Sequence, residues 1–339
     1  MSVAAAEWRE APEAVARQDE ALAEPLHRFV DHLRRRPPSV VVTCARGSSA
    51  HAATFAKHLV ERHLGIPVAA AAPVIASTYH RDLRLDGQLF LAISQSGRSH
   101  DLIETALSAK RAGALTAALV NDSGSPLAIV CDYVLPIGAG PERAVAATKS
   151  FVASLSALLR LVALWAEDAA MLAALARLPD RLAAAGRLDW EAATLSLAPA
   201  TSLVVIGRGP TLAIAREAAL KLKEIANVHA EAFSGSEFLH GPVALVGAGY
   251  PLLMFIASDA TASGMRELAR ELRGKNASLV CADPAGGNAG DLPTLPPDHP
   301  DADALCLIQS FYGMALRLAA ARGVDADSPR HLSKVTRTR

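Results

Sequence analysis

Short, continuous apolar runs recur along this chain, and a helix-like pattern follows most of them. Pro38–Cys44, Gln88–Ser94, Leu115–Asn121 and Tyr133–Ile137 are runs of this kind. A strand that is apolar throughout, rather than at alternate residues, is buried on both faces, which is typical of a parallel sheet covered by helices. The pattern therefore predicts an α/β fold with a doubly wound parallel sheet.

The same pattern returns in the second half of the chain. Thr201–Gly207 is an apolar run followed by Arg208-Gly209, which stands 162 residues after Arg46-Gly47. Such an internal repeat indicates two similar domains. We expect a short helix starting at Ser77–His80 and an N-terminal helix over about Ala11–Leu33. The predicted divisions are an N-terminal helical segment (1–33), a first domain (34–185), a second domain (186–322) and a tail (323–339).

Composition excludes several classes of protein. The 339 residues carry 34 basic and 34 acidic side chains, so the zero net charge gives no reason to expect nucleic acid or a charged membrane surface. The apolar stretch 150–178 is interrupted by charged residues and indicates a buried helix rather than a membrane span. Charged residues near the N-terminus argue against a signal peptide, so we expect a cytoplasmic protein. The cysteines form no CxxC, and we expect no metal and no cofactor.

The segment from Leu91 to Ala106 joins an apolar run to a helical pattern through a cluster of hydroxyl groups. Ser94, Gln95, Ser96, Gly97 and Ser99 fall where a strand hands over to a helix N-terminus. Hydroxyls, freed backbone N–H groups and the helix dipole together suit a phosphate group. The alternative is simple helix capping, but one cap needs a single such residue. The excess favours phosphate binding, and neutral donors favour a sugar phosphate over a nucleotide.

Three further motifs carry candidate chemistry. Lys221 and Glu224 are three residues apart on a predicted helix and so share one of its faces. They could form an ordinary surface ion pair, or Glu224 could act as a general base beside the Lys221 cation. His240 lies in a predicted turn and could move protons or be a structural histidine. Lys334, in the tail, could form a Schiff base or belong to a frayed terminus.

Together these motifs resemble a known family. ISQSG followed by a hydroxyl residue, AVAATKSF, ALKLKE, HAEAF, HGPVAL and the terminal segment containing Lys334 resemble the tandem sugar isomerase (SIS) domains, over nearly the whole chain and in order. These domains form the isomerase half of glucosamine-6-phosphate synthase and its stand-alone relatives. SQSGRS and the FLHGPV segment resemble the SIS-type glucosamine-6-phosphate deaminases most closely. The resemblance implies two tandem SIS domains, each a flavodoxin-like parallel sheet flanked by helices.

The resemblance also implies roles for individual residues. Ser49, Ser94, Gln95, Ser96 and Ser99 match the phosphate-binding residues, and Val145 matches a backbone contact to the sugar. Glu224 matches the base that moves a proton between C1 and C2, with Lys221 as its neighbour. His240 matches the ring-opening histidine, which in the family reaches the site from the other subunit of a homodimer. Lys334 matches the lysine associated with the open-chain sugar. Ala147 and Ser333 depart from the synthase pattern, in which serine and alanine stand there.

The implied activity is conversion of glucosamine 6-phosphate and water to fructose 6-phosphate and ammonia. The synthase needs a glutaminase domain to deliver ammonia, and the residues before the first predicted strand are too few for one, which favours the deaminating direction. Alternatives are another aldose–ketose phosphosugar isomerase, a galactosamine-phosphate deaminase and a fructosamine-phosphate deglycase. A non-catalytic sugar-phosphate sensor is disfavoured, because Glu224, His240 and Lys334 are all present.

Overall fold

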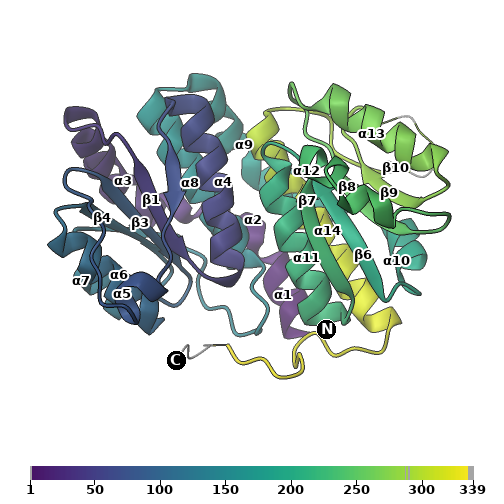
Figure 1. Ribbon diagram of the computed structural model, residues 1–339, viewed down its shortest axis with the longest axis horizontal. Helices are drawn as coiled ribbons and strands as arrows, with labels where there is room; N and C mark the ends of the chain where they lie inside the picture. Colours follow the sequence, from purple (N-terminus) through teal and green to yellow (C-terminus); the bar gives the residue numbers. More distant parts are fainter. Residues whose placement is uncertain (1, 287, 289–290, 335–339) are drawn as a thin grey trace. The chain divides into compact units, whose positions relative to one another are not determined.

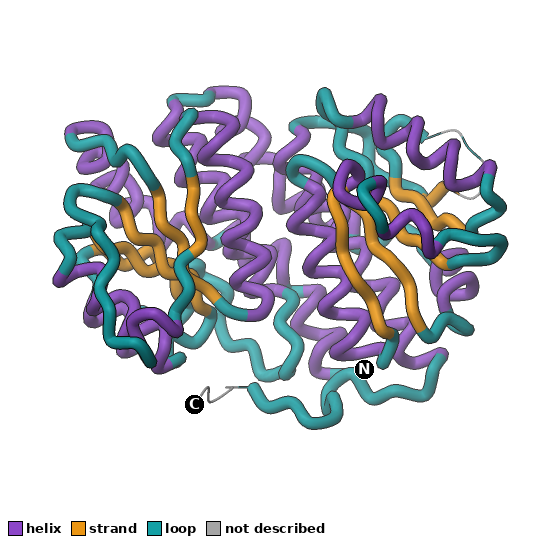
Figure 2. The backbone as a smooth tube through the Cα atoms, in the orientation of Figure 1, coloured by secondary structure: helices purple, strands orange, loops and turns teal. Residues whose placement is uncertain are grey.

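The computed structural model describes residues 2–286, 288 and 291–334, and the chain forms two compact units, each built on one parallel sheet (Figure 1, Figure 2). The first-sheet unit comprises residues 13–142, 149–175 and 333–334. The second-sheet unit comprises residues 2–12, 143–148, 176–286, 288 and 291–332. The predicted domain limits at residues 33, 185 and 322 stay a prediction.

The first sheet has five parallel strands in the order β2-β1-β3-β4-β5. These strands are β1 (Val41–Ala45), β2 (Val68–Ala70), β3 (Leu89–Ser94), β4 (Leu115–Val120) and β5 (Tyr133–Pro136). The helices are α3 (Gln18–Arg35), α4 (Gly47–Leu64), α5 (Val74–Ser77), α6 (His100–Arg111), α7 (Pro126–Val130) and α8 (Lys149–Ala166). Helices α3 and α4 pack with α8, whereas α5 and α7 pack with α6. Every residue of β3 is buried, as expected for a strand covered on both faces.

The chain reverses its direction of winding between β1 and β3. From β1 it passes through α4 to β2 on one side, whereas β3 pairs with the other side of β1. In an open α/β sheet, ligands bind beyond the carboxyl ends of the strands at such a switch point. The segments after β1 and β3 both begin at this edge.

The second sheet repeats this design with the strand order β10-β9-β8-β6-β7. Its strands are β6 (Ser202–Gly207), β7 (His229–Ser234), β8 (Pro251–Phe255), β9 (Ser278–Ala282) and β10 (Asp291–Leu292). The helices of this unit are α1 (Val3–Arg9), α10 (Glu191–Leu197), α11 (Thr211–Ala226), α12 (Gly235–Leu239), a 3-10 turn (Pro242–Leu245), α13 (Ala262–Gly274) and α14 (Pro300–Ala321). Two more helices, α2 (Ala11–Ala16) and α9 (Ala169–Ala185), complete the described chain. The predicted α/β fold with doubly wound parallel sheets is confirmed.

Two predicted helices were wrong in their limits. Over the predicted range Ala11–Leu33 the structure has two helices, α2 and α3, which are separated at Arg17, and a further helix, α1, precedes them. Pro25 lies inside α3 and does not end it. The helix expected to start at Ser77–His80 instead ends at Ser77. His80 adopts a left-handed φ of 51°, which a helix cannot include.

Strand β7 was not predicted from the sequence, because its residues do not form a continuous apolar run. It lies at the edge of the second sheet, and its alternate residues His229 and Glu231 are exposed. An edge strand needs no apolar residues on its solvent side, so no continuous apolar run marks it.

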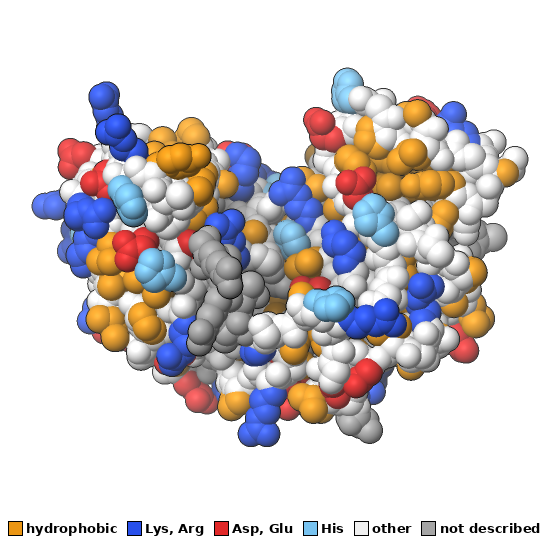
Figure 3. All heavy atoms as spheres, turned by 60° about the horizontal axis from the view of Figure 1, so that its bottom comes forward, with side chains coloured by type: hydrophobic (Ala, Val, Ile, Leu, Met, Phe, Trp, Pro, Cys, Tyr) orange, Lys and Arg blue, Asp and Glu red, His pale blue; other side chains and the backbone are white. Residues whose placement is uncertain are grey.

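Two helices, α8 and α14, are long and apolar enough to span a membrane by length and composition. However, 83% of the apolar window in α8 and 78% of that in α14 are buried within the protein. This burial agrees with the interpretation of the region after Ser150 as a core helix. On the face drawn in Figure 3, basic and acidic side chains are both present and lie interspersed.

Candidate active site

The predicted phosphate-binding residues of the first-sheet unit lie at its topological switch point. Ser94 is the last residue of β3, Ser99 is the N-cap of α6, and Ser49 lies in the first turn of α4 after β1. Because β1 and β3 are paired neighbours, their carboxyl ends meet at one edge of the sheet. The fold therefore brings the two serine clusters, which are about 50 residues apart in the sequence, to the same edge.

The loop between β3 and α6 is held by its own hydroxyl groups. Ser94 Oγ accepts the N–H of Gly97 at 3.1 Å, and Ser96 Oγ accepts the N–H of Arg98 at 3.3 Å. Gly97 adopts a left-handed φ of 61°, and a Cβ there would lie 2.1 Å from Ser125 Oγ. Within the described part of the chain, the Ser99 side chain makes no capping hydrogen bond to α6. Simple capping therefore does not account for Ser99, as the phosphate interpretation requires.

An ion pair next to this loop removes a negative charge that would repel an anion. Asp101 lies in the first turn of α6, and its side chain is 8% exposed. Arg46, the N-cap of α4, donates to Asp101 Oδ2 from Nε at 2.9 Å and from Nη2 at 2.7 Å. The guanidinium neutralises the carboxylate and ties the segment after β1 to the segment after β3. Sequence reasoning missed this pair.

In the second-sheet unit, α11 carries a buried charged cluster. Lys221 Nζ forms a close ion pair with the carboxylate of Glu224 and lies 3.5 Å from Glu217 Oε1. The side chains of Lys221 and Glu217 are 1% and 0% exposed, whereas Glu224 is 21% exposed. Tyr312 of α14 donates its hydroxyl to Glu217 Oε1 at 3.2 Å. Glu224 is thus the member of the cluster that a ligand in solution can reach.

Glu224 lies far along its helix from the carboxyl end of β6. Helix α11 begins at Thr211, beyond the carboxyl end of β6, and Glu224 follows 13 residues later. At 1.5 Å per residue this places Glu224 about 20 Å along the helix axis. Glu224 is therefore not at the switch point of the second sheet. The predicted pairing with Lys221 is observed, and Ala218, Leu222 and Ile225 are buried on the same helix.

Lys334 is paired with a buried carboxylate in the first-sheet unit. Its Nζ lies 3.3 Å from Glu142 Oε2, and the Glu142 side chain is 0% exposed. Glu142 also accepts the N–H of Ser150 at 3.0 Å and its hydroxyl at 2.5 Å, both from the first turn of α8. The pair presents Lys334 as a cation. A Schiff base requires the neutral amine, so forming one would require this pair to open.

The remaining predicted residues belong to the second-sheet unit. Val145 is half-buried in the irregular segment 143–148, before α8. His240 is exposed at the end of α12 and precedes the 3-10 turn. Leu239, beside it in the sequence, and Leu245, at the end of the 3-10 turn, are 50% and 56% exposed. The structure thus groups Lys221, Glu224, Val145 and His240 in one unit and the phosphate serines with Gln95 and Lys334 in the other.

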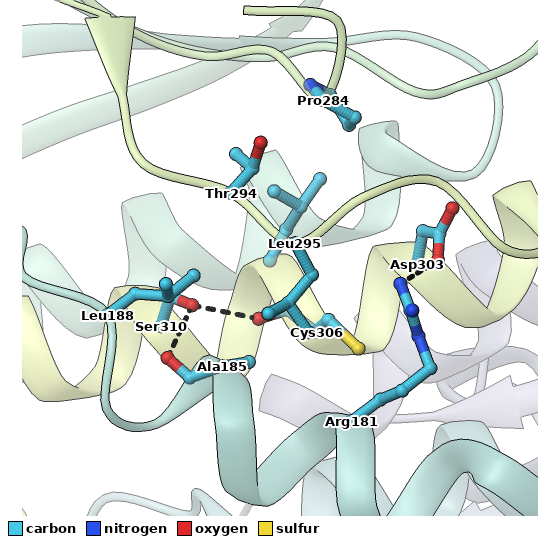
Figure 4. Close-up of a pocket in the computed structure, with 10 residues that line it drawn as sticks. Arg181, Ala185, Leu188, Pro284, Thr294, Leu295, Asp303, Cys306 and Ser310 are labelled. Carbon is cyan, nitrogen blue, oxygen red and sulfur yellow. Dashed lines mark hydrogen bonds and ion pairs between the residues drawn. The ribbon is translucent and has the colours of Figure 1, made fainter.

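A pocket in the second-sheet unit is too small to be a substrate site. It is lined by Arg181 of α9 and by Asp303, Cys306 and Ser310 of α14, and its volume is about 10 Å³. This leaves room for one water molecule at most. Figure 4 shows Arg181 paired with Asp303, at 2.8 Å, and Asp303 also accepts the hydroxyl of Ser258 after β8. Asp303 thus links the loop after β8 and helix α9 to helix α14.

The described residues offer no group of three or more His, Cys, Asp or Glu side chains that could hold a metal ion. All four cysteines lie within the described residues and are buried free thiols, as predicted. Burial raises the pKa of each to about 12: Cys44, Cys131, Cys281 and Cys306. Neutral thiols of this kind are poor nucleophiles and poor metal ligands.

Comparison with known proteins supports the resemblance seen in the sequence. The family model described as the SIS domain matches residues 36–164 and 196–285. The glutamine–fructose-6-phosphate aminotransferase (isomerizing) of Thermotoga maritima is 31% identical over 335 residues, covering 94% of this chain and 54% of that protein. The chain spans about half the length of the curated relatives it matches.

Two solved structures share the fold. A Silicibacter pomeroyi protein, provisionally named a phosphosugar isomerase, is 44% identical with a TM-score of 0.92, and the match covers 96% of this chain and 100% of that one. The C-terminal domain of glucosamine-fructose-6-phosphate aminotransferase from Francisella tularensis is 25% identical with a TM-score of 0.87, covering 97% and 98% of the two chains.

Proposed function

Because the chain belongs to the SIS domain family, we propose that it is an enzyme that moves a proton between adjacent carbons of a phosphorylated sugar. The observation that carries this proposal is the serine loop at the switch point of the first sheet. Among the described residues, the Ser99 side chain makes no capping hydrogen bond. The acidic side chains beside the loop, Asp101 and Asp122, are paired with Arg46 and Arg98. Such a loop suits a phosphate group, which anchors one end of a small substrate.

The proposed chemistry assigns a role to each candidate residue. Ser49, Ser94, Gln95, Ser96 and Ser99 bind the phosphate, and the backbone at Val145 contacts the sugar. Glu224 takes the proton from one carbon and returns it to the next, because its carboxylate is partly exposed while its neighbour Lys221 is buried. Lys221 and Lys334 supply positive charge, which stabilises the oxyanion of an enediol or enolamine. These roles need no metal and no cofactor.

The finer proposal is a glucosamine-6-phosphate deaminase that releases fructose 6-phosphate and ammonia. Its support is the resemblance of the SQSGRS and FLHGPV segments to SIS-type deaminases. The names of the curated relatives support the opposite direction, amination of fructose 6-phosphate. Both directions share the same proton transfer, so the same residues would serve either one.

We further propose a homodimer in which His240 acts on the substrate bound by the partner subunit. His240 is exposed, and the exposed leucines near it in the sequence, Leu239 and Leu245, are the side chains an interface would cover. A histidine near neutral pH can donate and accept the protons needed to open the sugar ring. We also propose that the protein acts in the cytoplasm, where a reducing environment suits its four free thiols.

The test is to incubate the purified protein with glucosamine 6-phosphate in the presence of EDTA and to measure ammonia and fructose 6-phosphate together. Equal release of both supports a metal-independent deaminase. The matched control is E224Q, which keeps the shape of the side chain but cannot take up a proton. Isomerisation of another hexose phosphate without ammonia release would support the broader proposal and overturn the finer one. No turnover of any hexose phosphate would overturn both.

A further inference from the structure

A buried carboxylate from the N-terminal helix holds the segment that carries Val145. Glu7 of α1 accepts the N–H of Arg143 on Oε1 at 2.5 Å and the N–H of Ala144 on Oε2 at 3.0 Å. Glu7 is 5% exposed, and more than 130 residues separate it from both partners in the sequence. Two charge-assisted bonds to consecutive N–H groups fix the orientation of the two peptides that lead into Ala144, the residue before Val145.

Helix α1 is itself anchored within the second-sheet unit. The indole N–H of Trp8 donates to the carbonyl of Gln309 in α14 at 2.8 Å, and Gln309 Nε2 donates back to the Trp8 carbonyl at 3.2 Å. The Trp8 ring packs on Gly313, where a Cβ would lie 2.7 Å from Trp8 Cζ2. At the other end, the Asp327 carboxylate accepts the N–H groups of Val3 and Ala4 at 2.7 and 2.8 Å. Hydrogen bonds at both ends of α1 therefore hold the helix that carries Glu7 in place.

We propose that Glu7 is a positioning residue that presents the backbone at Val145 to the sugar part of the substrate. This inference rests on the proposed function. Val145 is half-buried in a segment without regular secondary structure, so no ladder of strand or helix hydrogen bonds sets its orientation. A neutral packing residue would fill the same space, but it would leave two neighbouring N–H groups without a buried acceptor. The carboxylate therefore serves the geometry of the segment.

The effect of losing Glu7 differs between the two ends of the substrate. The phosphate-binding serines belong to the first-sheet unit, whereas Glu7 and Val145 belong to the second. Removing the Glu7 charge should therefore weaken recognition of the sugar and leave recognition of phosphate unchanged. A general loss of stability would instead weaken both, and this difference separates a positioning role from a merely structural one.

The test compares E7Q with E10Q, a matched substitution of an exposed glutamate at the end of the same helix. The glutamine in E7Q offers one oxygen and turns an NH₂ group toward the second N–H. We expect KM for glucosamine 6-phosphate to rise about tenfold or more in E7Q. Inhibition by inorganic phosphate should stay within about twofold of the unsubstituted protein, which is close to the error of such measurements. E10Q should match the unsubstituted protein in both.

Several outcomes would contradict the inference, and they can be told apart from failure of the proposed function. Equal KM values in folded E7Q and E10Q would overturn it alone, as would a parallel loss of phosphate inhibition in E7Q. No turnover of any hexose phosphate by the unsubstituted protein would overturn the proposed function and this inference together. If another hexose phosphate is turned over, KM is compared with that sugar as the substrate. If E7Q does not fold, G313A displaces Trp8 and α1 while keeping Glu7. G313A should raise KM by a smaller factor with unchanged phosphate inhibition, and an unchanged KM would count against the proposal.

Discussion

Replacement of Gly97 by alanine should damage the phosphate loop through two separable effects. A non-glycine residue at the Gly97 φ of 61° costs about 1–2 kcal/mol. The new Cβ would also lie 2.1 Å from Ser125 Oγ and 2.6 Å from Ser125 Cβ, and overpacking of this kind costs about 1–3 kcal/mol. Together these terms predict a loss of about 2–5 kcal/mol, or a displaced loop that weakens phosphate binding.

The assay is thermal unfolding combined with calorimetric titration of inorganic phosphate. G124A is the matched control, because its new Cβ would lie 3.5 Å from Asp122 Oδ1, an ordinary contact. In the double variant G97A/S125G the clash with Ser125 is absent. Relative to S125G alone, this double variant should lose only about 1–2 kcal/mol, the cost of the left-handed backbone at residue 97. The reasoning is refuted if G97A melts and binds phosphate as G124A does.

Three further predictions follow from the same structure. Burial raises the pKa of all four thiols to about 12: Cys44, Cys131, Cys281 and Cys306. In the native protein they should therefore resist iodoacetamide at pH 8, and they should react after unfolding. Rapid labelling of the native protein would contradict this. Burial alone would raise the pKa of Asp283, but the hydrogen bonds and charge of Arg266 lower it overall. The ionised carboxylate therefore stabilises the fold fully above its unfolded pKa of about 3.9. This stabilisation is lost as the pH falls through the lower pKa of the folded state. D283N should therefore show a smaller loss of Tm on acidification, and an unchanged loss would argue against the pair. Mixing H240A chains with E224Q chains should restore activity if His240 serves the partner's substrate, whereas no activity in demonstrated mixed dimers would place both residues in one subunit.

Much of the fold could be predicted because it depends on patterns that are local in the sequence. Continuous apolar runs mark strands buried on both faces, and the repeat after 162 residues reflects a second sheet of the same design. The hydroxyl cluster after β3 was also predicted from a local pattern, because the end of β3 and the start of α6 are adjacent in the sequence. Lys221 and Glu224 were paired from their spacing on one helix face, and Glu217 could have been added from its i,i+4 spacing to Lys221.

What could not be predicted depends on contacts between distant segments. No local pattern links Glu7 to Ala144 or Tyr312 to Glu217, since these pairs are 137 and 95 residues apart. The Arg46–Asp101 pair likewise appears only when β1 and β3 become neighbours in the sheet. Helix α1 and the break at Arg17 between α2 and α3 were both missed, because the alanine-rich N-terminus shows no clear apolar stripe.

The most direct test of the central claim is solvent-hydrogen exchange into the sugar. Fructose 6-phosphate and glucosamine 6-phosphate would each be incubated in D₂O with the unsubstituted protein and with E224Q, and deuterium at C1 and C2 would be followed by NMR. Proton transfer through Glu224 predicts deuterium uptake with the unsubstituted protein and none with E224Q. Equal uptake with E224Q would contradict the assignment of the base. An absence of both deuterium uptake and conversion of these sugars with the unsubstituted protein would contradict proton transfer on them.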